Sequence, residues 1–343
     1  MWHALYLQPF VVAFVSAVLF GSVALWCAGL IKKQSARLGE RHLHSGRVIR
    51  LGGLAIAGAF LLTILLDSHL FISHSLVGVL WGVVAILGFG LWDDWRELNW
   101  QTQLTFQLGL AGLLVWWGIR VEYVANPWGG LWLLQSGLSF WIGAVVAVCW
   151  IVILINVMNW IDGVDGLSGS VTLITSATIF FLALKTEVNQ PPLAILAAGF
   201  AGAVLGFLVF NFSPARLLAG TAGSMLMGFV LAALSIFAGA KVATALLVLT
   251  IPVVDFLWVI GERWRAGKSI FVSDSRHLHH KLLARGWSHQ KITLTYLFIT
   301  TTLALVALNT RAAGKISVGI TVAVVTISLL IWFSGEAKAK ANS

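Results

Sequence analysis

The chain has 343 residues, of which 59% are hydrophobic and only 10% are charged. Soluble globular proteins carry about 25% charged residues, so this composition excludes a water-soluble fold, and its hydrophobicity excludes a disordered chain. Both cysteines, Cys27 and Cys149, lie in apolar runs, which excludes a disulfide scaffold. The formal net charge of +9 must then lie in loops beside a bilayer, where lipid headgroups or phosphorylated substrates are expected partners rather than nucleic acid. The sequence predicts an all-α polytopic membrane protein.

A bilayer crossing needs about 20 mainly apolar residues. Eleven segments fit this rule, in chain order 10–31, 50–66, 70–91, 103–119, 138–159, 167–184, 192–212, 222–238, 241–261, 292–308 and 315–333. The short segment 50–66 and the Gly- and Ala-rich segment 222–238 fit it least well. Eleven crossings put the two termini on opposite faces of the membrane, and we expect residues 1–343 to form a single membrane domain.

Positive charge is unequally divided between the two sets of loops. Of the 22 Lys and Arg residues, 17 fall on the side reached after the first segment and 5 on the other. Because positively charged loops stay in the cytoplasm, we expect the N-terminus outside and the C-terminus in the cytoplasm. The expected cytoplasmic loops are 32–50, 92–102, 156–166, 213–221 and 262–291.

Two adjacent carboxylates, Asp93 and Asp94, follow the third apolar segment. Neighbouring carboxylates repel each other, so they need water, a cation or a hydrogen-bond donor close by. Hard cations take oxygen ligands, and carboxylates act as general bases, so the pair indicates a Mg²⁺ or general-base site. An ordinary acidic loop beside the membrane is the alternative, and the pair alone does not decide between the two.

The densest polar motif ends the fifth apolar segment. Asn156 and Asn159 are three residues apart and share a face of a helix, and Asp162 and Asp165 each precede a glycine. Carboxylates and amides that converge at the end of a span suit a uracil, a sugar or a metal. A plain Asp-Gly turn is the alternative, although four polar groups at three-residue spacing argue against it.

Two further motifs suit phosphate. Asn211 leads through Pro214 into the Gly-Thr-Ala-Gly-Ser segment 220–224, and a glycine-rich start of a helix presents free N–H groups. Gly and Ser also serve as packing residues between membrane helices. The loop 262–291 carries seven Lys or Arg residues with three histidines, His277, His279 and His280, which indicates a diphosphate clamp, or else a basic loop with incidental histidines.

The ninth apolar segment holds a carboxylate, Asp255, just after Pro252. A carboxylate there needs a partner, and Arg263, about two helical turns on, is one candidate.

With eleven spans, all of these motifs fall on one face of the membrane, which predicts one composite cytoplasmic site. In order, spacing and sidedness they resemble the polyprenyl-phosphate N-acetylhexosamine-1-phosphate transferase family, also called glycosyltransferase family 4. The matching pieces are Arg50-Leu51-Gly52-Gly53, Asp93-Asp94 with Leu98 and Gln107, Asn156…Asn159…Asp162-Gly-Val-Asp165-Gly-Leu, Asn211…Pro214-Ala215, Pro252…Asp255…Arg263 and His277-Leu-His279-His280.

The resemblance implies eleven membrane helices with the active site in a cytoplasmic cleft of a bacterial inner-membrane protein. It implies transfer of a sugar 1-phosphate from a UDP-N-acetylhexosamine to undecaprenyl phosphate, with release of UMP, at the start of a cell-envelope glycan. The implied cofactor is Mg²⁺, for which Mn²⁺ could substitute. The Arg-Leu-Gly-Gly stretch resembles the N-acetylglucosamine branch more than the phospho-MurNAc-pentapeptide transferases, which stay an alternative. Whether the chain forms a homodimer is left open.

The same resemblance assigns roles to residues. The implied catalytic residues are Asp93, Asp94, Asp162, His277, His279 and His280. The implied substrate-binding residues are Arg50, Asn156, Asn159, Asp165, Asn211, Gly223, Ser224, Arg263 and Arg276. The implied metal ligands are Asp93, Asp94, Asp162 and Asp165.

Two positions depart from the family pattern. Thr221 stands where the family has an Asp that binds Mg²⁺, and Gln103 stands where it has a basic residue. A neutral hydroxyl is a poor replacement for a carboxylate on a hard dication. Either neighbouring carboxylates compensate, or the chain is a catalytically impaired member that serves as a binding or scaffold subunit.

Overall fold

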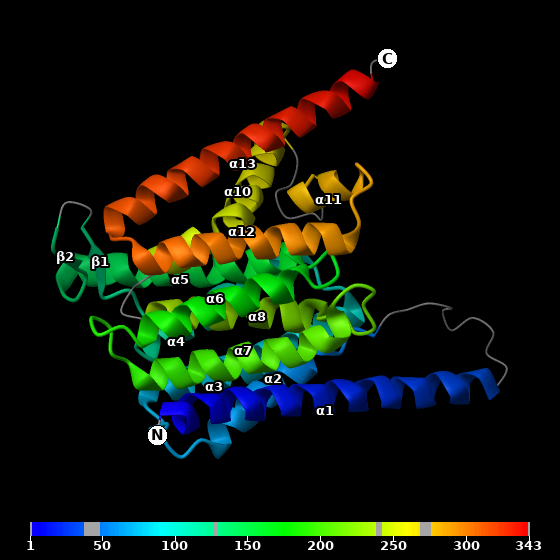
Figure 1. Cartoon of the computed structure of the whole chain (residues 1–343), viewed down its shortest axis with the longest axis horizontal. Coiled ribbons are helices and arrows are strands. Elements are labelled where there is room, and N and C mark those ends of the chain that lie inside the picture. The colour runs from blue at the N-terminus through cyan, green and yellow to red at the C-terminus, as the bar shows by residue number, and fades with distance from the viewer. Residues whose placement is uncertain (1, 38–48, 127–128, 238–241, 268–275, 342–343) are drawn as a thin grey trace.

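The computed structural model describes residues 2–37, 49–126, 129–237, 242–267 and 276–341 (Figure 1). These residues form helices and one short hairpin. The helices are α1 (Trp2–Arg37), α2 (Gly52–Leu66), α3 (His74–Arg96), α4 (Trp100–Trp116), α5 (Gly137–Ile161), α6 (Leu167–Ala183), α7 (Pro191–Asn211), α8 (Gly220–Phe237), α9 (Val242–Val248), α10 (Thr250–Arg265), α11 (Leu278–Leu283), α12 (His289–Asn309) and α13 (Ala312–Ala341). The strands β1 (Tyr123–Ala125) and β2 (Leu131–Leu133) pair antiparallel.

Most of the helices lie side by side along one direction (Figure 1). Helix α8 is at the centre, where it packs against α2, α3, α5 and α6, and most of its residues are buried. Helix α7 packs between α1 and α6, whereas α13 crosses the outside of the bundle against α9 and α10. Apolar side chains cover both the inside and the outside of this bundle, as they must when the surrounding solvent is lipid.

Seven of the described helices are long and apolar enough to cross a membrane, or eight if α9 and α10 count as one bent span. The prediction of an all-α polytopic membrane protein is therefore confirmed. Each of the eleven predicted segments contains a helix, but α2 has only 15 residues and α6 only 17. Helices of that length reach about 23–26 Å, less than the hydrocarbon core of about 30 Å. The count of eleven crossings and the orientation therefore stay predictions.

The predicted continuous span 241–261 is broken. Helix α9 ends at Val248, and α10 starts at Thr250 at an angle of 80° to it. Pro252 accounts for the break, because its ring lacks an N–H and collides with the carbonyl four residues earlier, at Val248. Within the first turn of α10 the same proline is tolerated, since N–H groups there need no partner within the helix.

The bundle has two distinct ends. The β1–β2 hairpin lies at one end, and α11 lies at the other together with the loop 212–219 between α7 and α8 (Figure 1). Helices α3, α5 and α7 finish at the α11 end, and α8 and α12 start there. The polar motifs of the sequence are attached to these helix ends, so the fold brings them to one end of the molecule.

Candidate active site

Several of the predicted site residues come together at the start of α8, and the Asp94 side chain on α3 caps that helix. The two carboxylate oxygens of Asp94 accept hydrogen bonds from the backbone N–H groups of Thr221, at 3.0 Å, and Ala222, at 3.3 Å. Helix starts leave such N–H groups without partners inside the helix, and the positive end of the helix dipole favours an anion. Thr221, which replaces the expected Asp, therefore contributes a backbone donor to a carboxylate supplied by α3.

Glycines let α2 and α3 approach α8 closely enough for this contact. A Cβ on Gly90 would lie 2.3 Å from Cα of Ala222, and one on Gly53 would lie 2.5 Å from the nitrogen of Gly223. Neither position can accept a side chain, so backbone packs on backbone. Asp94 follows Gly90 by one helical turn and is thereby carried to the end of α8.

Arg50 reaches the same place through backbone pairing. The segment 49–53 runs alongside 217–219, with the Leu218 N–H donating to the Ile49 carbonyl at 2.8 Å and the Gly52 N–H donating to the Leu218 carbonyl at 2.9 Å. The charge of Arg50, whose residue is exposed, acts on the carboxylates of Asp94 and Asp162. The sequence predicted a substrate-binding Arg50, and the structure brings it to the two acidic motifs.

Asp93 is nearly buried, with 7% of the residue exposed. One of its oxygens accepts hydrogen bonds from the Leu98 N–H at 3.0 Å and from Nε2 of Gln103 at 2.9 Å. Gln103 thus donates to Asp93 from the position where the family has a basic residue. The replacement removes a positive charge and keeps a hydrogen-bond donor.

Asn156 and Asn159 lie on one face of α5, as predicted, but they meet different partners. Asn159 accepts a hydrogen bond from the Ser224 hydroxyl on α8 at 2.7 Å, and Asn156 donates to Oε1 of Gln107 on α4 at 2.6 Å. Gln107 is 1% exposed, and its Nε2 has no partner in the part of the chain that the structure describes. A buried donor without a partner costs about 1–3 kcal/mol, so this position in the middle of α4 carries an unsatisfied hydrogen-bond donor.

Asp162 follows the last residue of α5 and is half-buried. Its carboxylate accepts a hydrogen bond from the Ser168 hydroxyl. Burial raises the pKa of Asp162 from 3.8 to about 7, Ser168 opposes that shift, and the negative charge of Asp94 adds to it. Asp162 and Asp94 thus act on each other electrostatically from two different helices.

The histidines lie against the same turn. A Cβ on Gly163 would be 3.0 Å from Nε2 of His279 and 3.3 Å from Cε1 of His280, so a residue larger than glycine would push the histidines away. His279 is fully buried, and neither of its ring nitrogens has a partner among the described residues. Burial lowers the pKa of His279 well below 6.5, and the neighbouring His280 and His277 lower it further.

His277 is fixed by Asp255. Its Nδ1 lies 2.9 Å from one oxygen of Asp255 on α10, and the other oxygen accepts the Leu278 N–H at 2.8 Å. The sequence offered Arg263 as one candidate partner for Asp255, and the structure gives His277 instead. Arg263 is buried in the last turn of α10, and Arg276 immediately precedes His277.

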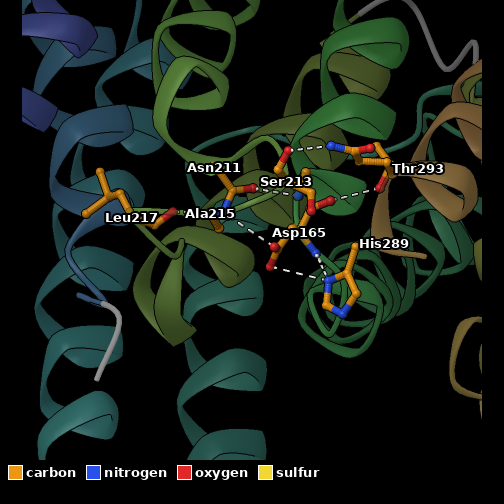
Figure 2. Close-up of polar contacts among 9 residues, drawn as sticks. Asp165, Asn211, Ser213, Ala215, Leu217, His289 and Thr293 are labelled. Atoms are coloured by element: carbon orange, nitrogen blue, oxygen red, sulfur yellow. Dashed lines mark hydrogen bonds and ion pairs between the residues drawn. The ribbon is translucent and has the colours of Figure 1, made fainter. Parts of the chain in front are cut away.

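Asp165 and Asn211 belong to a separate set of contacts (Figure 2). The Asp165 carboxylate accepts the Ala215 N–H at 3.1 Å and lies 3.4 Å from Nδ1 of His289, while its carbonyl accepts the Thr293 hydroxyl at 2.8 Å. Asn211 accepts the Gly166 N–H at 3.0 Å and donates to the Leu217 carbonyl at 2.8 Å. Both side chains are engaged in joining the turn after α5 to the loop before α8 and to α12.

The structure therefore brings most predicted site residues to the α11 end. Around the start of α8 it places Arg50, Asp93, Asp94, Asn159, Asp162, Gly223 and Ser224, with His279 and His280 against Gly163, whereas Asn156 lies further from this point and bonds Gln107. Parts of two predicted loops, 38–48 of the first and 268–275 of the last, lie outside the described residues.

Three contributors were not among the predicted site residues. Gln107 was known only as part of a matching motif, and Ser168 and His289 were not singled out. A Gln in an apolar span is costly unless it is used, and this was the available signal for Gln107. Ser168 and His289 carry no such signal, because a Ser after a turn and a His at the start of a helix are common.

The described residues contain no group of three or more His, Cys, Asp or Glu side chains arranged to hold a metal ion. Mg²⁺ differs from metals that need such a cage, since it commonly takes one or two carboxylates and completes its shell with water and substrate phosphates. The oxygen donors of Asp94 and Asp162 are of the kind that Mg²⁺ takes.

Comparison with known proteins points to one family. Residues 76–239 match the model of glycosyl transferase family 4. The decaprenyl-phosphate N-acetylglucosaminephosphotransferase of Mycobacterium tuberculosis is 33% identical over 81% of this chain and 77% of its own length. The probable undecaprenyl-phosphate N-acetylglucosaminyl 1-phosphate transferase of Bacillus subtilis is 28% identical over 84% and 81%. A phospho-N-acetylmuramoyl-pentapeptide-transferase of Levilactobacillus brevis is 29% identical over 72% and 79%.

Proposed function

The chain belongs to glycosyl transferase family 4, and on that premise we propose that it transfers N-acetylglucosamine 1-phosphate from UDP-N-acetylglucosamine to undecaprenyl phosphate, releasing UMP. The proposal rests on one observation: the Asp94 carboxylate caps the start of α8, and Asp162, Asp93 and Arg50 lie beside it. A phosphorylated substrate needs cationic side chains that bind its phosphates, and close to them carboxylates that bind the metal cation accompanying those phosphates. The relatives named for N-acetylglucosamine match more of this chain than the pentapeptide transferase does, which favours that donor.

The proposed topology is one membrane domain of eleven crossings, with the α11 end in the cytoplasm of a bacterial inner membrane. The 17 Lys and Arg residues on this side against 5 on the other support that orientation. A cytoplasmic site is also where a nucleotide sugar would be met. The short helices α2 and α6 would cross the bilayer surrounded by longer ones.

In the proposed reaction an oxygen of the lipid phosphate attacks the β-phosphorus of the donor. The new P–O bond joins the two phosphates, the bond from the β-phosphorus to the bridging oxygen breaks, and UMP leaves with that electron pair. Asp93 would hold the lipid phosphate's proton, while Arg50, Arg263 and the histidines would offset the charge on the diphosphate. Asp94 and Asp162 would hold Mg²⁺, which when bound would neutralise diphosphate charge.

A second candidate is an impaired member that binds these lipids without catalysis, and Gln103 and Thr221 favour it. Against it, the N–H of Thr221 binds the Asp94 carboxylate, so an acid is present at the start of α8 without an Asp at position 221. Gln103 likewise still binds Asp93. The Asp94 carboxylate thus partly replaces the missing acid at position 221, and the Gln103 amide keeps a hydrogen bond to Asp93 in place of the missing cation.

The test is release of UMP by the purified chain supplied with UDP-N-acetylglucosamine, undecaprenyl phosphate and Mg²⁺, with Mn²⁺ in a parallel series. Turnover by the wild type that is lost in Asp93→Asn supports the transferase. A silent wild type that gains turnover in Thr221→Asp supports the impaired member. Silence in all variants, with lipid binding retained across a panel of UDP-sugars, overturns the transferase proposal.

A further inference from the structure

The polar contact between α10 and α11 is the best-defined one that the proposed reaction leaves without a role. Asp255 is 1% exposed and lies on α10, part of a candidate bent membrane span, where a buried carboxylate is costly unless it is fully paired. Both of its oxygens are used: one bonds Nδ1 of His277 at 2.9 Å, and the other accepts the Leu278 N–H at 2.8 Å. An ionisable residue that is kept fully paired inside a membrane usually has a functional role, so the Asp255–His277 pair is expected to have one.

Helix α11 depends on this contact for its position. It has six residues, far fewer than the dozen or so that an isolated helix needs in water, and its N-cap residue, His277, makes no side-chain capping bond. Asp255 supplies the missing cap from another helix through the Leu278 N–H. At the other end of α11, the Arg285 guanidinium lies 3.8 Å from the centre of the Phe333 ring on α13. The helix is therefore held in place from outside at both ends.

The same contact constrains the proton on His277. An ionised carboxylate can only accept hydrogen bonds. Since one oxygen of Asp255 accepts the Leu278 N–H, the other must accept from Nδ1 of His277, which therefore carries a proton. Nε2 is then the ring nitrogen that can interact elsewhere. The ring is also fixed by its neighbours. It stacks on His279 with 7° between the ring planes, and it packs edge-to-face with Trp160 with 5.1 Å between the ring centres.

We propose that Asp255 is a positioning residue of the active site: it holds His277 in the Nδ1-protonated tautomer and caps α11, so that His277, His279 and His280 are presented to the Asp162–Gly163 turn in one arrangement. The proposal rests on the transferase function for its effect on turnover, although the tautomer itself does not. Asp255 touches no reacting atom and acts through the histidine.

Two substitutions separate capping from tautomer control. In Asp255→Asn the amide oxygen can still accept the Leu278 N–H, but the amide NH₂ can only donate to His277, which moves the ring proton to Nε2. In Asp255→Ala both bonds are lost. Asp67→Asn is the matched control, because Asp67 likewise accepts backbone N–H groups, in its case two, at 2.8 and 3.1 Å, and lies 3.7 Å from a histidine, but at the hairpin end.

The measurements are ¹⁵N spectra of histidine-labelled protein, thermal unfolding and UMP release. The His277 signals are assigned by their loss in His277→Gln. We expect Asp255→Asn to exchange the two ring-nitrogen signals, to unfold within about 3 °C of the wild type, and to lower kcat at least about thirtyfold with the acceptor KM nearly unchanged. Asp255→Ala should unfold well below both, and Asp67→Asn should match the wild type in turnover.

The proposal is overturned if Asp255→Asn leaves the His277 signals as they are, or if it exchanges them with no loss of kcat. It is equally overturned if Asp255→Asn unfolds as early as Asp255→Ala and its kcat per folded molecule is that of the wild type, since the role is then structural alone. A wild type that releases no UMP refutes the transferase function, and the spectra still decide the tautomer.

Discussion

Asp162 and Asp165 lie three residues apart in one turn, and their surroundings differ sharply. The Asp165 carboxylate accepts the Ala215 N–H and lies beside His289, while the Asp165 backbone donates its N–H to Nδ1 of His289 and accepts the Thr293 hydroxyl at its carbonyl. Within the part of the chain that the structure describes, Asp162 has one hydroxyl partner, its pKa is raised by burial, and the buried His279 beside it has no hydrogen-bond partner. Among the described residues, the polar groups on one side of the turn are bonded within the protein, and those on the other side keep unused hydrogen-bonding capacity.

The largest effect is expected from Asp162→Asn. The amide can still accept the Ser168 hydroxyl, so folding should be preserved, while the charge that faces a ligand is lost. We expect kcat for UMP release to fall at least about a hundredfold, with the midpoint of thermal unfolding within about 3 °C of the wild type. A variant that keeps its turnover would remove Asp162 from the ligand side of the turn.

Asp165→Ala should act on stability instead. It removes the acceptor of the half-buried Ala215 N–H and the carboxylate beside His289, which should lower the free energy of unfolding by about 1–3 kcal/mol. Thermal unfolding in detergent measures this loss, and UMP release per folded molecule should change less than about tenfold. Unchanged stability with turnover abolished would show that the predicted metal-binding role of Asp165 is the better account.

Gln103→Leu tests a smaller contribution. It removes one of the two donors to the oxygen of Asp93 while keeping the volume of the side chain nearly the same. A hydrogen bond to a charged group is worth about 1.5–3 kcal/mol, so kcat/KM should fall about tenfold or somewhat more. Gln103→Lys is the companion variant, and its turnover should equal or exceed that of the wild type if the position only needs a donor.

The smallest effect is a pH dependence from His279. Its pKa in the folded protein is lowered by burial, whereas in the unfolded chain it stays near 6.5, so below that value the unfolded state takes up a proton that the folded state does not. Stability should therefore fall on acidification, by about 0.8 kcal/mol from His279 between about pH 7.5 and pH 6. His279→Gln should reduce this slope in unfolding measurements at the two pH values, and an unchanged slope would contradict a neutral, buried His279.

Much of this arrangement could be predicted from the sequence, because apolar runs and the placement of polar residues are local signals. The helices, the gathering of the motifs at one end, and the shared face of Asn156 and Asn159 follow from such patterns. The break at residue 249 was missed, since a hydropathy window does not distinguish a proline in a first turn from one in a helix interior.

The difference between the hydrogen-bond partners of Asp162 and those of Asp165 could not be predicted. Their identical Asp-Gly context gives no hint that residues 50 and 124 positions further on, Ala215 and His289, occupy one of them. Asp94 is a similar case, because its role as a cap of α8 depends on the close approach of two helices that only the tertiary structure shows.

The glycine contacts at the start of α8 have a bearing on which substitutions the protein tolerates. Gly53 and Gly90 are buried against α8 and leave room only for peptide groups, so the position of Asp94 depends on contacts between backbones. Any side chain at Gly53 or Gly90 would displace α8 and Asp94 with it. Tolerated variation is therefore expected in the loops that carry Arg50 and the histidines.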